Sequence, residues 1–408
     1  MSNGRVPFKI VKQDDARVGA DTPGAVVVGG DYVGLGIVRS LGRHGIPVCV
    51  VDDEYSISRF SRFADYAVRV PTLRDEQATV DAMLALPSRL PIAGWVVFPT
   101  RDEVVGSFSR RRGELREVFR VPLPPWETTS WAWDKRKTYA LANRLGVPTP
   151  RTWYPTSPRE LAEIDAEPPF AVKPAIKEHF FYATGAKAWR AGSWEELKAR
   201  FEEASRLVPA GEVMVQELIP GDGRYQFSFC AFFRRDRSIA SMVARRRRQH
   251  PPEFGRASTF AETVDLPVLE ERSEQLLGAI DYYGLVEIEY KRDPRDGAYK
   301  LLDFNARAWG YHTLGLEAGV DFPRLVFADQ LGASLEPRRG RPGVRWVRLV
   351  TDVPTLAVEI RNGRLGWKDL FGTLAGGFDV EAVFSREDPR PGLAEIALLP
   401  YLVYKRGF

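Results

Sequence analysis

The chain has 408 residues, of which 44% are hydrophobic and 27% are charged. This composition is ordinary for a soluble globular protein, and the length predicts two or three subdomains rather than a single core. The 58 lysines and arginines exceed the 54 aspartates and glutamates by only four, so net charge gives no argument for a nucleic-acid partner.

Cysteine usage and apolar runs bear on the compartment. Cys49 and Cys230, the only cysteines, both lie inside apolar runs, which predicts buried thiols in a reducing compartment and no disulfide framework. No apolar run approaches the ~18 residues of a membrane span. Residues 1–22 form a polar lead-in without the apolar segment of a signal peptide, and we expect this lead-in to be partly disordered. The sequence therefore predicts a cytoplasmic protein that does not bind a membrane.

Residues 23–126 have the pattern of a Rossmann-like domain. The apolar run at 25–29 is typical of a buried parallel strand, and a glycine-rich turn, a helical stretch and a second apolar strand at 48–51 follow it. A glycine-rich turn before a helix can hold a phosphate. The glycine spacing over residues 29–36 does not match the dinucleotide motif, however, so these glycines equally suit close packing of the helix on the sheet. The proline-rich stretch at 121–126 marks the end of this domain.

Lys135 and Lys173, which follow along the chain, lie in positions that favour binding of an anion. Lys135 opens an amphipathic helix that ends before residues 146–150, and a cation at a helix N-terminus opposes the helix dipole. A solvated surface lysine is the alternative at this position. Lys173 lies within the apolar strand 170–174, and lysine is seldom buried without a partner. A nucleotide phosphate would serve as that partner.

The next segments lead from a turn to a second strand. The turn at 175–185 is aromatic rather than glycine-rich, and Lys187 follows it. Residues 213–215 predict a strand that continues into Gln216, Glu217, Leu218 and Ile219 and then into a Pro-Gly turn containing Asp222. An ordinary strand followed by a turn is enough to explain residues 213–222. This segment therefore indicates a binding site only through its position in the order of the other motifs.

Four consecutive arginines at 245–248 could indicate nucleic-acid binding. We do not favour that interpretation, because the chain has no wider basic field and no interleaved aromatic residues. If the run ends a strand, alternate arginines face opposite ways, and one pair can point into a cleft. A planar guanidinium there suits phosphate or carboxylate.

Residues 283–309 predict a β-hairpin that carries a metal site. Glu287 and Glu289 share one face of the first strand by the alternation of strand side chains. The same rule places three polar residues on one face of the second strand: Asp303, Asn305 and Arg307. If the turn closes near residues 295–296, Glu287 lies across from Asp303. Two carboxylates with an amide oxygen suit Mg²⁺, whereas an exposed hairpin with solvated charges is the alternative.

These motifs, in this order, resemble the ATP-grasp superfamily over about residues 26–331. The family form is a sheet opener, an Asp-Lys helix, a strand lysine, a hinge, and an acid followed on the next strand by acidic-x-Asn-x-Arg. The implied fold is α/β, with an N-terminal Rossmann-like pre-grasp domain and two α+β subdomains that clamp ATP. The implied domains are 23–126, 127–335 with a lid subdomain at about 145–215, and a C-terminal extension at 336–408. The aromatic turn and the arginine run are similar to a branch of predicted carboxylate–amine ligases that resemble D-aspartate ligase.

The resemblance implies a role for each matched residue. It implies that ATP is bound by Lys135, Lys173, Lys187, Gln216, Glu217, Leu218, Ile219 and Asp222. Either Glu217 or Asp222 would contact the ribose. It implies that Mg²⁺, or Mn²⁺ in its place, is held by Glu287, Asp303 and Asn305. It implies that the catalytic residues are Arg307 and, from the arginine run, Arg245 and Arg248.

The implied activity is ATP-dependent ligation of a carboxylate to an amine. ATP would phosphorylate the carboxylate, and the amine would displace phosphate from the acyl phosphate to form an amide or peptide-type bond. The expected partners are small molecules, an amino acid or a small peptide, with no nucleic acid, and the superfamily also makes a homodimer a reasonable expectation. Two alternatives stay open: an ATP-binding sensor or regulatory protein without turnover, and, less favoured, an NAD(P)-dependent oxidoreductase that uses the turn at 29–36.

Overall fold

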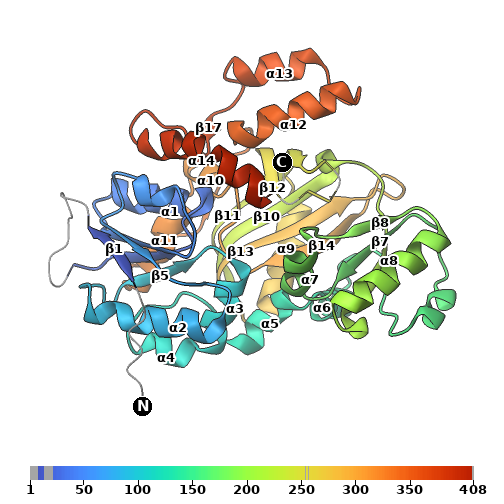
Figure 1. Ribbon diagram of the computed structural model, residues 1–408, viewed down its shortest axis with the longest axis horizontal. Helices are drawn as coiled ribbons and strands as arrows, with labels where there is room; N and C mark the ends of the chain where they lie inside the picture. The colour runs from blue at the N-terminus through green and yellow to red at the C-terminus, as the bar shows by residue number, and fades with distance from the viewer. Residues whose placement is uncertain (1–7, 13–21, 253, 256, 407–408) are drawn as a thin grey trace.

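Three β-sheets organise the computed structural model, which describes residues 8–12, 22–252, 254–255 and 257–406 (Figure 1). We call them the N-terminal sheet, with strands β1 to β5, the lid sheet, with strands β6 to β9, and the central sheet, with strands β10 to β17. In the view of Figure 1 the central sheet lies between the N-terminal sheet on the left and the lid sheet on the right.

The N-terminal sheet forms the Rossmann-like unit, with strand order β1-β4-β3-β2-β5. Strands β2 to β5 pair in parallel, and β2 and β3 are buried along their whole length, which explains their continuous apolar sequences. The strands are β1 (Lys9–Lys12), β2 (Ala25–Val28), β3 (Val48–Asp52), β4 (Tyr66–Arg69) and β5 (Val96–Pro99). The helices of this unit are α1 (Tyr32–Arg43), α2 (Glu76–Ala85), α3 (Asp102–Arg110) and α4 (Arg112–Arg116).

Strand β1 falls within the segment expected to be a partly disordered lead-in. It pairs antiparallel with β4 at the edge of the sheet, and Phe8 and Ile10 pack against the neighbouring hydrophobic core. These two apolar side chains and the free backbone edge of β4 explain why a strand forms here. Residues 1–7 and 13–21 lie outside the described residues, so for them the expectation of disorder stays a prediction.

The glycine-rich turn between β2 and α1 serves close packing. A Cβ atom on Gly34 would lie 2.2 Å from the carbonyl oxygen of Gly29, and one on Gly36 would lie 2.6 Å from the imidazole of His312. The backbone N–H of Gly30 donates to Oδ2 of Asp52 at 2.6 Å. The close approaches at Gly34 and Gly36 require glycine without any phosphate, which favours the packing explanation over dinucleotide binding.

The lid sheet has its own hydrophobic core. Its strands, in the order β6-β9-β7-β8, are β6 (Thr152–Trp153), β7 (Phe170–Pro174), β8 (Trp189–Ala191) and β9 (Val213–Glu217), with helices α7 (Lys177–Thr184) and α8 (Trp194–Leu207). Fully buried Phe170, Phe180 and Phe201 belong to this core. The aromatic stretch expected to be a turn is therefore largely helical: α7 buries Phe180 and ends at Gly185, which adopts the left-handed conformation with φ of 67°.

The central sheet carries the expected hairpin and extends into the C-terminal segment. Its main path runs β14-β13-β10-β11-β12-β16-β17, and β15 pairs with β11. The strands are β10 (Gln226–Arg234), β11 (Arg237–His250), β12 (Ala257–Val264), β13 (Tyr283–Arg292), β14 (Tyr299–Asn305), β15 (Arg338–Arg339), β16 (Arg345–Val347) and β17 (Val380–Glu381). The helices around it are α5 (Trp126–Trp133), α6 (Lys135–Arg144), α9 (Pro267–Gly278), α10 (Thr313–Glu317), α11 (Phe322–Gln330), α12 (Leu349–Arg361), α13 (Trp367–Leu374) and α14 (Arg390–Arg406).

The C-terminal extension is tied to the rest of the molecule at both of its ends. Strands β15 to β17 add to the central sheet. Asp388, which is completely buried, accepts hydrogen bonds from Nε of Arg39 at 3.0 Å and from Oγ of Ser61 at 2.7 Å, both in the N-terminal unit. Within the part of the chain that is described, no helix is long and apolar enough to cross a membrane.

Candidate functional site

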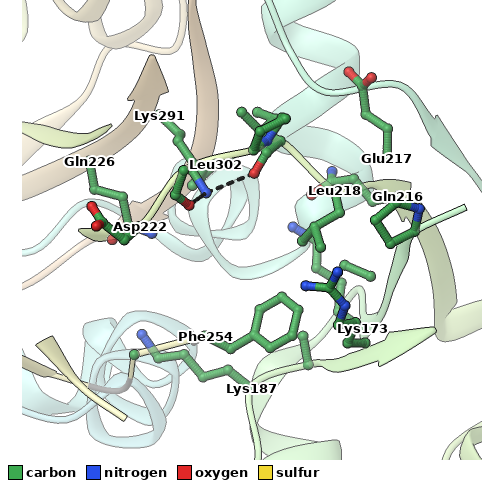
Figure 2. Close-up of a pocket in the computed structure, with 18 of the residues that line it drawn as sticks. Lys173, Lys187, Gln216, Glu217, Leu218, Asp222, Gln226, Phe254, Lys291 and Leu302 are labelled. Atoms are coloured by element: carbon green, nitrogen blue, oxygen red, sulfur yellow. Dashed lines mark hydrogen bonds between the residues drawn. The ribbon is translucent and has the colours of Figure 1, made fainter. Parts of the chain in front are cut away.

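A cavity of about 990 Å³ lies between the lid sheet and the central sheet. Every residue that the sequence suggested for ATP binding lines it, together with Asp303: Lys135, Lys173, Lys187, Gln216, Glu217, Leu218, Ile219 and Asp222. Figure 2 shows Lys173, Lys187 and Phe254 along one side of this cavity, with Lys291 and Asp222 on the other. The remaining suggested residues do not line it: Glu287, Asn305, Arg307, Arg245 and Arg248.

The hairpin forms as expected, but its register differs by two residues. Glu289, not Glu287, lies opposite Asp303, and Glu287 lies opposite Asn305. The pairing beside the turn, with Arg292 opposite Tyr299, accounts for one of these two positions. An irregularity after Glu289, where one extra residue of β14 is accommodated, accounts for the other. A hairpin register deduced from the turn alone misses such a bulge.

The corrected register changes which carboxylates face the cavity. Glu289 and Asp303 both line it, whereas Oε1 of Glu287 accepts a hydrogen bond from the hydroxyl of Tyr311 at 2.6 Å. Nδ2 of Asn305 lies 3.3 Å from Oε2 of Glu287 and 3.0 Å from Oε1 of Glu289, so the amide connects the two glutamates. Glu289 is the residue that the sequence interpretation left out of the metal set, although its shared face with Glu287 was already evident.

The two carboxylates that face the cavity are held in their charged form. Burial by itself would raise the pKa of Asp303, but Lys135 and Lys177 lower it to about 2. Burial would likewise raise the pKa of Glu289, but Arg246 and Lys187 lower it. Metal ligands must be deprotonated, and two charged carboxylates match the oxygen donors that Mg²⁺ prefers. Among the described residues no group of three or more His, Cys, Asp or Glu side chains is placed to hold a metal.

The lysines make this cavity electropositive. Nζ of Lys135 forms an ion pair with Asp303. Nζ of Lys173 donates to the hydroxyl of Tyr139 at 2.8 Å, and burial together with Lys135 lowers the pKa of Lys173 to about 7. Burial also lowers the pKa of Lys187. Buried lysines without carboxylate partners are costly unless an anion binds them, and a polyphosphate would supply that anion.

The resemblance implied that either Glu217, in the hinge at residues 216–219, or Asp222, in the turn after it, contacts the ribose of ATP. These two acids differ in their surroundings. Oε1 of Glu217 accepts from the backbone N–H of Arg151 at 3.0 Å, and Oε2 accepts from Arg295 at 3.0 Å. In Figure 2 the Glu217 carboxylate points away from Lys173. Asp222 instead lies at the exposed rim of the cavity, where it pairs with Arg224. Both acids therefore have basic partners within the chain, and Asp222 is the more exposed of the two.

Lys291 is a hinge residue that the sequence did not single out. Its Nζ donates to the carbonyl oxygens of Ile219 at 2.8 Å and Gly221 at 2.6 Å (Figure 2). These bonds fix the turn that follows the hinge. The residue lies on β13, two positions after Glu289, so a single strand carries both a metal-ligand candidate and a support for the turn at residues 219–221.

The arginine run presents one member to the cavity, and it is neither of the two expected. Arg246 lines the cavity, donates to Oε2 of Glu289 at 3.2 Å, and is buried. Nε of Arg245 donates to the carbonyl oxygen of Arg224 at 3.0 Å, on the other face of the strand. The placement of Arg248 follows from pairing shifts on both sides of it, which break the alternation and turn its side chain toward α12.

Arg307 lies beside the cavity and is held by the N-terminal unit. Its Nε donates to Oδ1 of Asp102 at 2.7 Å, and its Nη2 donates to Oδ2 at 3.0 Å. Lys177 of α7 pairs with the same carboxylate, and the hydroxyl of Tyr182 donates to Oε1 of Glu103 at 2.7 Å. Asp102 thus connects the N-terminal unit, the lid and Arg307. Its position just after β5, at the carboxyl end of the N-terminal sheet, was the only sequence signal for this role.

The chain is similar in sequence to one characterised enzyme and in fold to several solved structures. No protein-family model matches the sequence. The chain is 24% identical over 328 residues to a D-aspartate ligase from Enterococcus faecium (strain Aus0004), across 75% of this chain and 76% of that protein. Among solved structures, an L-amino acid ligase from Bacillus licheniformis superposes with a TM-score of 0.60 at 16% identity, covering 79% of this chain and 78% of that chain.

Two further solved structures contain nucleotides. N5-carboxyaminoimidazole synthetase from Staphylococcus aureus, complexed with ADP, superposes with a TM-score of 0.61 at 13% identity over 79% of this chain and 80% of that chain. The biotin carboxylase domain of Hydrogenobacter thermophilus 2-oxoglutarate carboxylase, solved with MgADP and bicarbonate, gives a TM-score of 0.62 at 16% identity over 79% and 73%. These proteins share the ATP-grasp fold, so the fold expected from the sequence is confirmed.

Proposed function

We propose that this chain, which has the ATP-grasp fold, is an ATP-dependent carboxylate–amine ligase. The observation that carries the proposal is the pairing of Glu289 with Asp303 in a cavity that Lys173 and Lys187 also line. Carboxylates placed opposite each other suit a divalent cation, and the nearby lysines suit the phosphates that such a cation accompanies.

In the first step, phosphorylation of the substrate carboxylate, the cavity residues have different roles. Lys135, Lys173 and Lys187 would bind the phosphates and hold them in line with the substrate carboxylate. Glu289 and Asp303 would hold Mg²⁺, which offsets charge on the phosphates when bound. Asn305, whose amide nitrogen donates to Glu287 and Glu289, would orient Glu289. An oxygen of the substrate carboxylate attacks the γ-phosphorus, the bond to ADP breaks, and an acyl phosphate forms.

The second step needs an amine and a group that stabilises negative charge. The amine attacks the acyl carbon, the bond to phosphate breaks, and the amine loses a proton. Arg307 lies beside Asn305 with its guanidinium fixed by Asp102, so it is positioned to stabilise the developing oxyanion or the departing phosphate. Arg246 fixes Glu289, and in place of Arg245 and Arg248 it is the member of the arginine run that lines the cavity.

Amino acids are the substrates we favour, because two of the similar proteins are a D-aspartate ligase and an L-amino acid ligase. Mg²⁺ is supported by the MgADP of one structural neighbour, and Mn²⁺ in its place is a further proposal. A homodimer and a cytoplasmic location are likewise proposals, the first supported by the description of that same neighbour as a dimer.

ADP release tests the proposed function. The wild-type protein, with ATP and Mg²⁺, is screened against pairs of amino acids in both enantiomeric forms. We expect ADP release that requires a pair and an amide product that mass spectrometry detects. ATP binding with no ADP release for any pair would instead favour the sensor. A thermal-shift comparison of Mg-ATP with NAD⁺ and NADP⁺ separates both from the oxidoreductase, which alone would be stabilised by the dinucleotides.

A further inference from the structure

Helices α12 and α13 of the C-terminal extension form a helical hairpin that a buried ion pair fixes to the central sheet. Nε and a terminal nitrogen of Arg248 donate to the two carboxylate oxygens of Asp352 at 2.8 and 2.7 Å. The same arginine donates to the hydroxyl of Thr373 on α13 at 2.9 Å, and Asp352 is completely buried. Arg248 therefore connects β11 with both helices of the hairpin.

The end of α12 reaches the cavity that holds the lysines and the carboxylate pair. Glu359 on α12 and Arg364 just beyond it both line that cavity. Nearby lining residues include Gln249 and the loop residues Pro252 and Gly255, so the hairpin and this loop enclose the same region. No motif of the sequence had indicated that the extension contributes to the site.

Glu359 is an incompletely satisfied acid in the cavity wall. Its side chain is 13% exposed, and a terminal nitrogen of Arg364 lies 2.8 Å from its Oε1. This contact lacks hydrogen-bond geometry, and among the described residues the enclosed Oε1 has no well-aligned hydrogen-bond donor. A buried carboxylate oxygen that lacks a donor is costly, and a ligand ammonium group would supply the donor.

Two further features indicate that Glu359 would bind a positive group of a ligand and Arg364 a negative group. Glu359 lies in the last turn of α12, where the carbonyl ends of the helix favour a positive group. Arg364 is 54% exposed, so its planar guanidinium has free donors for a carboxylate. An ammonium and a carboxylate on one small molecule would match this acid and this base together.

We propose that the α12–α13 hairpin forms an amino-acid subsite of the cavity, in which Glu359 binds the ammonium group and Arg364 the carboxylate of a substrate. The inference rests on the proposed ligase function for its biological meaning, but the binding it describes can be measured without turnover. The ligand class is an amino acid, or a peptide end that carries both groups.

Calorimetry on the full chain loaded with Mg-ADP tests the subsite. Both enantiomers of each proteinogenic amino acid are screened, and the best binder is compared with its own deaminated and decarboxylated analogues; for aspartate these are succinate and β-alanine. Glu359→Gln should weaken the amino acid about tenfold or more, to the level of the deaminated analogue, while leaving that analogue unchanged. Arg364→Gln should do the same relative to the decarboxylated analogue. Arg361→Gln, an exposed change on the same helix outside the cavity lining, is the matched control.

The outcomes separate the subsite from the proposed function. Absence of amino-acid binding by the wild type, or equal losses for the amino acid and both analogues, overturns the subsite. Weaker Mg-ADP binding in either variant, with amino-acid binding unchanged, also overturns it, because the pair would then serve the nucleotide. If the wild type releases ADP with amino-acid pairs while these variants match the control, the ligase stands and the subsite falls. Binding that follows the predicted pattern without any ADP release supports the subsite and refutes the ligase.

Discussion

Removal of the Arg248 side chain should loosen the C-terminal hairpin. In Arg248→Ala, the buried carboxylate of Asp352 loses both of its contacts to the guanidinium and keeps the hydroxyl of Thr259, which donates at 2.7 Å. Breaking one partner of a buried ion pair costs about 3–5 kcal/mol, because the remaining charge stays buried without compensation. We expect this loss to appear locally, as faster amide exchange over residues 349–374.

A double variant gives the sharper measurement. Arg248→Met with Asp352→Leu removes both charges and fills the space with apolar atoms, a replacement that is often neutral or stabilising for buried pairs. The hydroxyls of Thr259 and Thr373 would lose a partner each, at about 1 kcal/mol per hydrogen bond. The double variant should therefore lose about 2 kcal/mol or less, compared with about 3–5 kcal/mol for the single change.

Activity decides between an anchor and a substrate-binding arginine. Hydrogen exchange and kcat/KM for ADP release are measured on the same samples of wild type, Arg248→Ala and the double variant. If Arg248 anchors the hairpin, activity recovers together with protection in the double variant. If it binds the substrate anion, as the sequence alone suggested, the double variant stays inactive although its hairpin is protected. Normal exchange in Arg248→Ala would refute the structural reasoning altogether.

Three further predictions test the cavity. Glu289→Gln should abolish Mg²⁺-dependent ADP release, whereas Glu287→Gln should cost less; the reverse order in a Mg²⁺ titration would contradict the corrected register. Burial lowers the pKa of Lys173 to about 7, and bound phosphate favours the charged amine. ATP affinity measured by calorimetry should therefore fall as the pH rises above 7, by up to about tenfold per pH unit. The fall should be shallower in Lys173→Met, which has no amine to titrate. Asp102→Asn should lower kcat about tenfold or more with ATP affinity little changed, because Arg307 loses the carboxylate that holds it. An unchanged kcat in this variant would show that Asp102 does not position Arg307 for catalysis.

The sequence by itself determined the features that depend on neighbouring residues. Alternating apolar residues and a turn rich in Asp, Pro and Gly are enough to specify the hairpin of β13 and β14. A lysine inside an apolar strand already implied an anionic partner, and Lys173 lies in the cavity. The order of such local motifs was sufficient for the ATP-grasp fold, because each motif requires only its own strand, helix or turn.

The tertiary structure alone decided which side chains meet. The pairing beside the turn and one extra residue in β14 together placed Asp303 opposite Glu289 instead of Glu287, and shifts of this kind change facing partners without changing the local pattern. Arg248 and Asp352 are 104 residues apart, and nothing near either one indicates the other. The metal pair, the anchor of the hairpin and the cavity role of Glu359 all depend on contacts between distant segments. Such contacts follow from how the sheets and helices pack together, and a local sequence pattern does not contain that information.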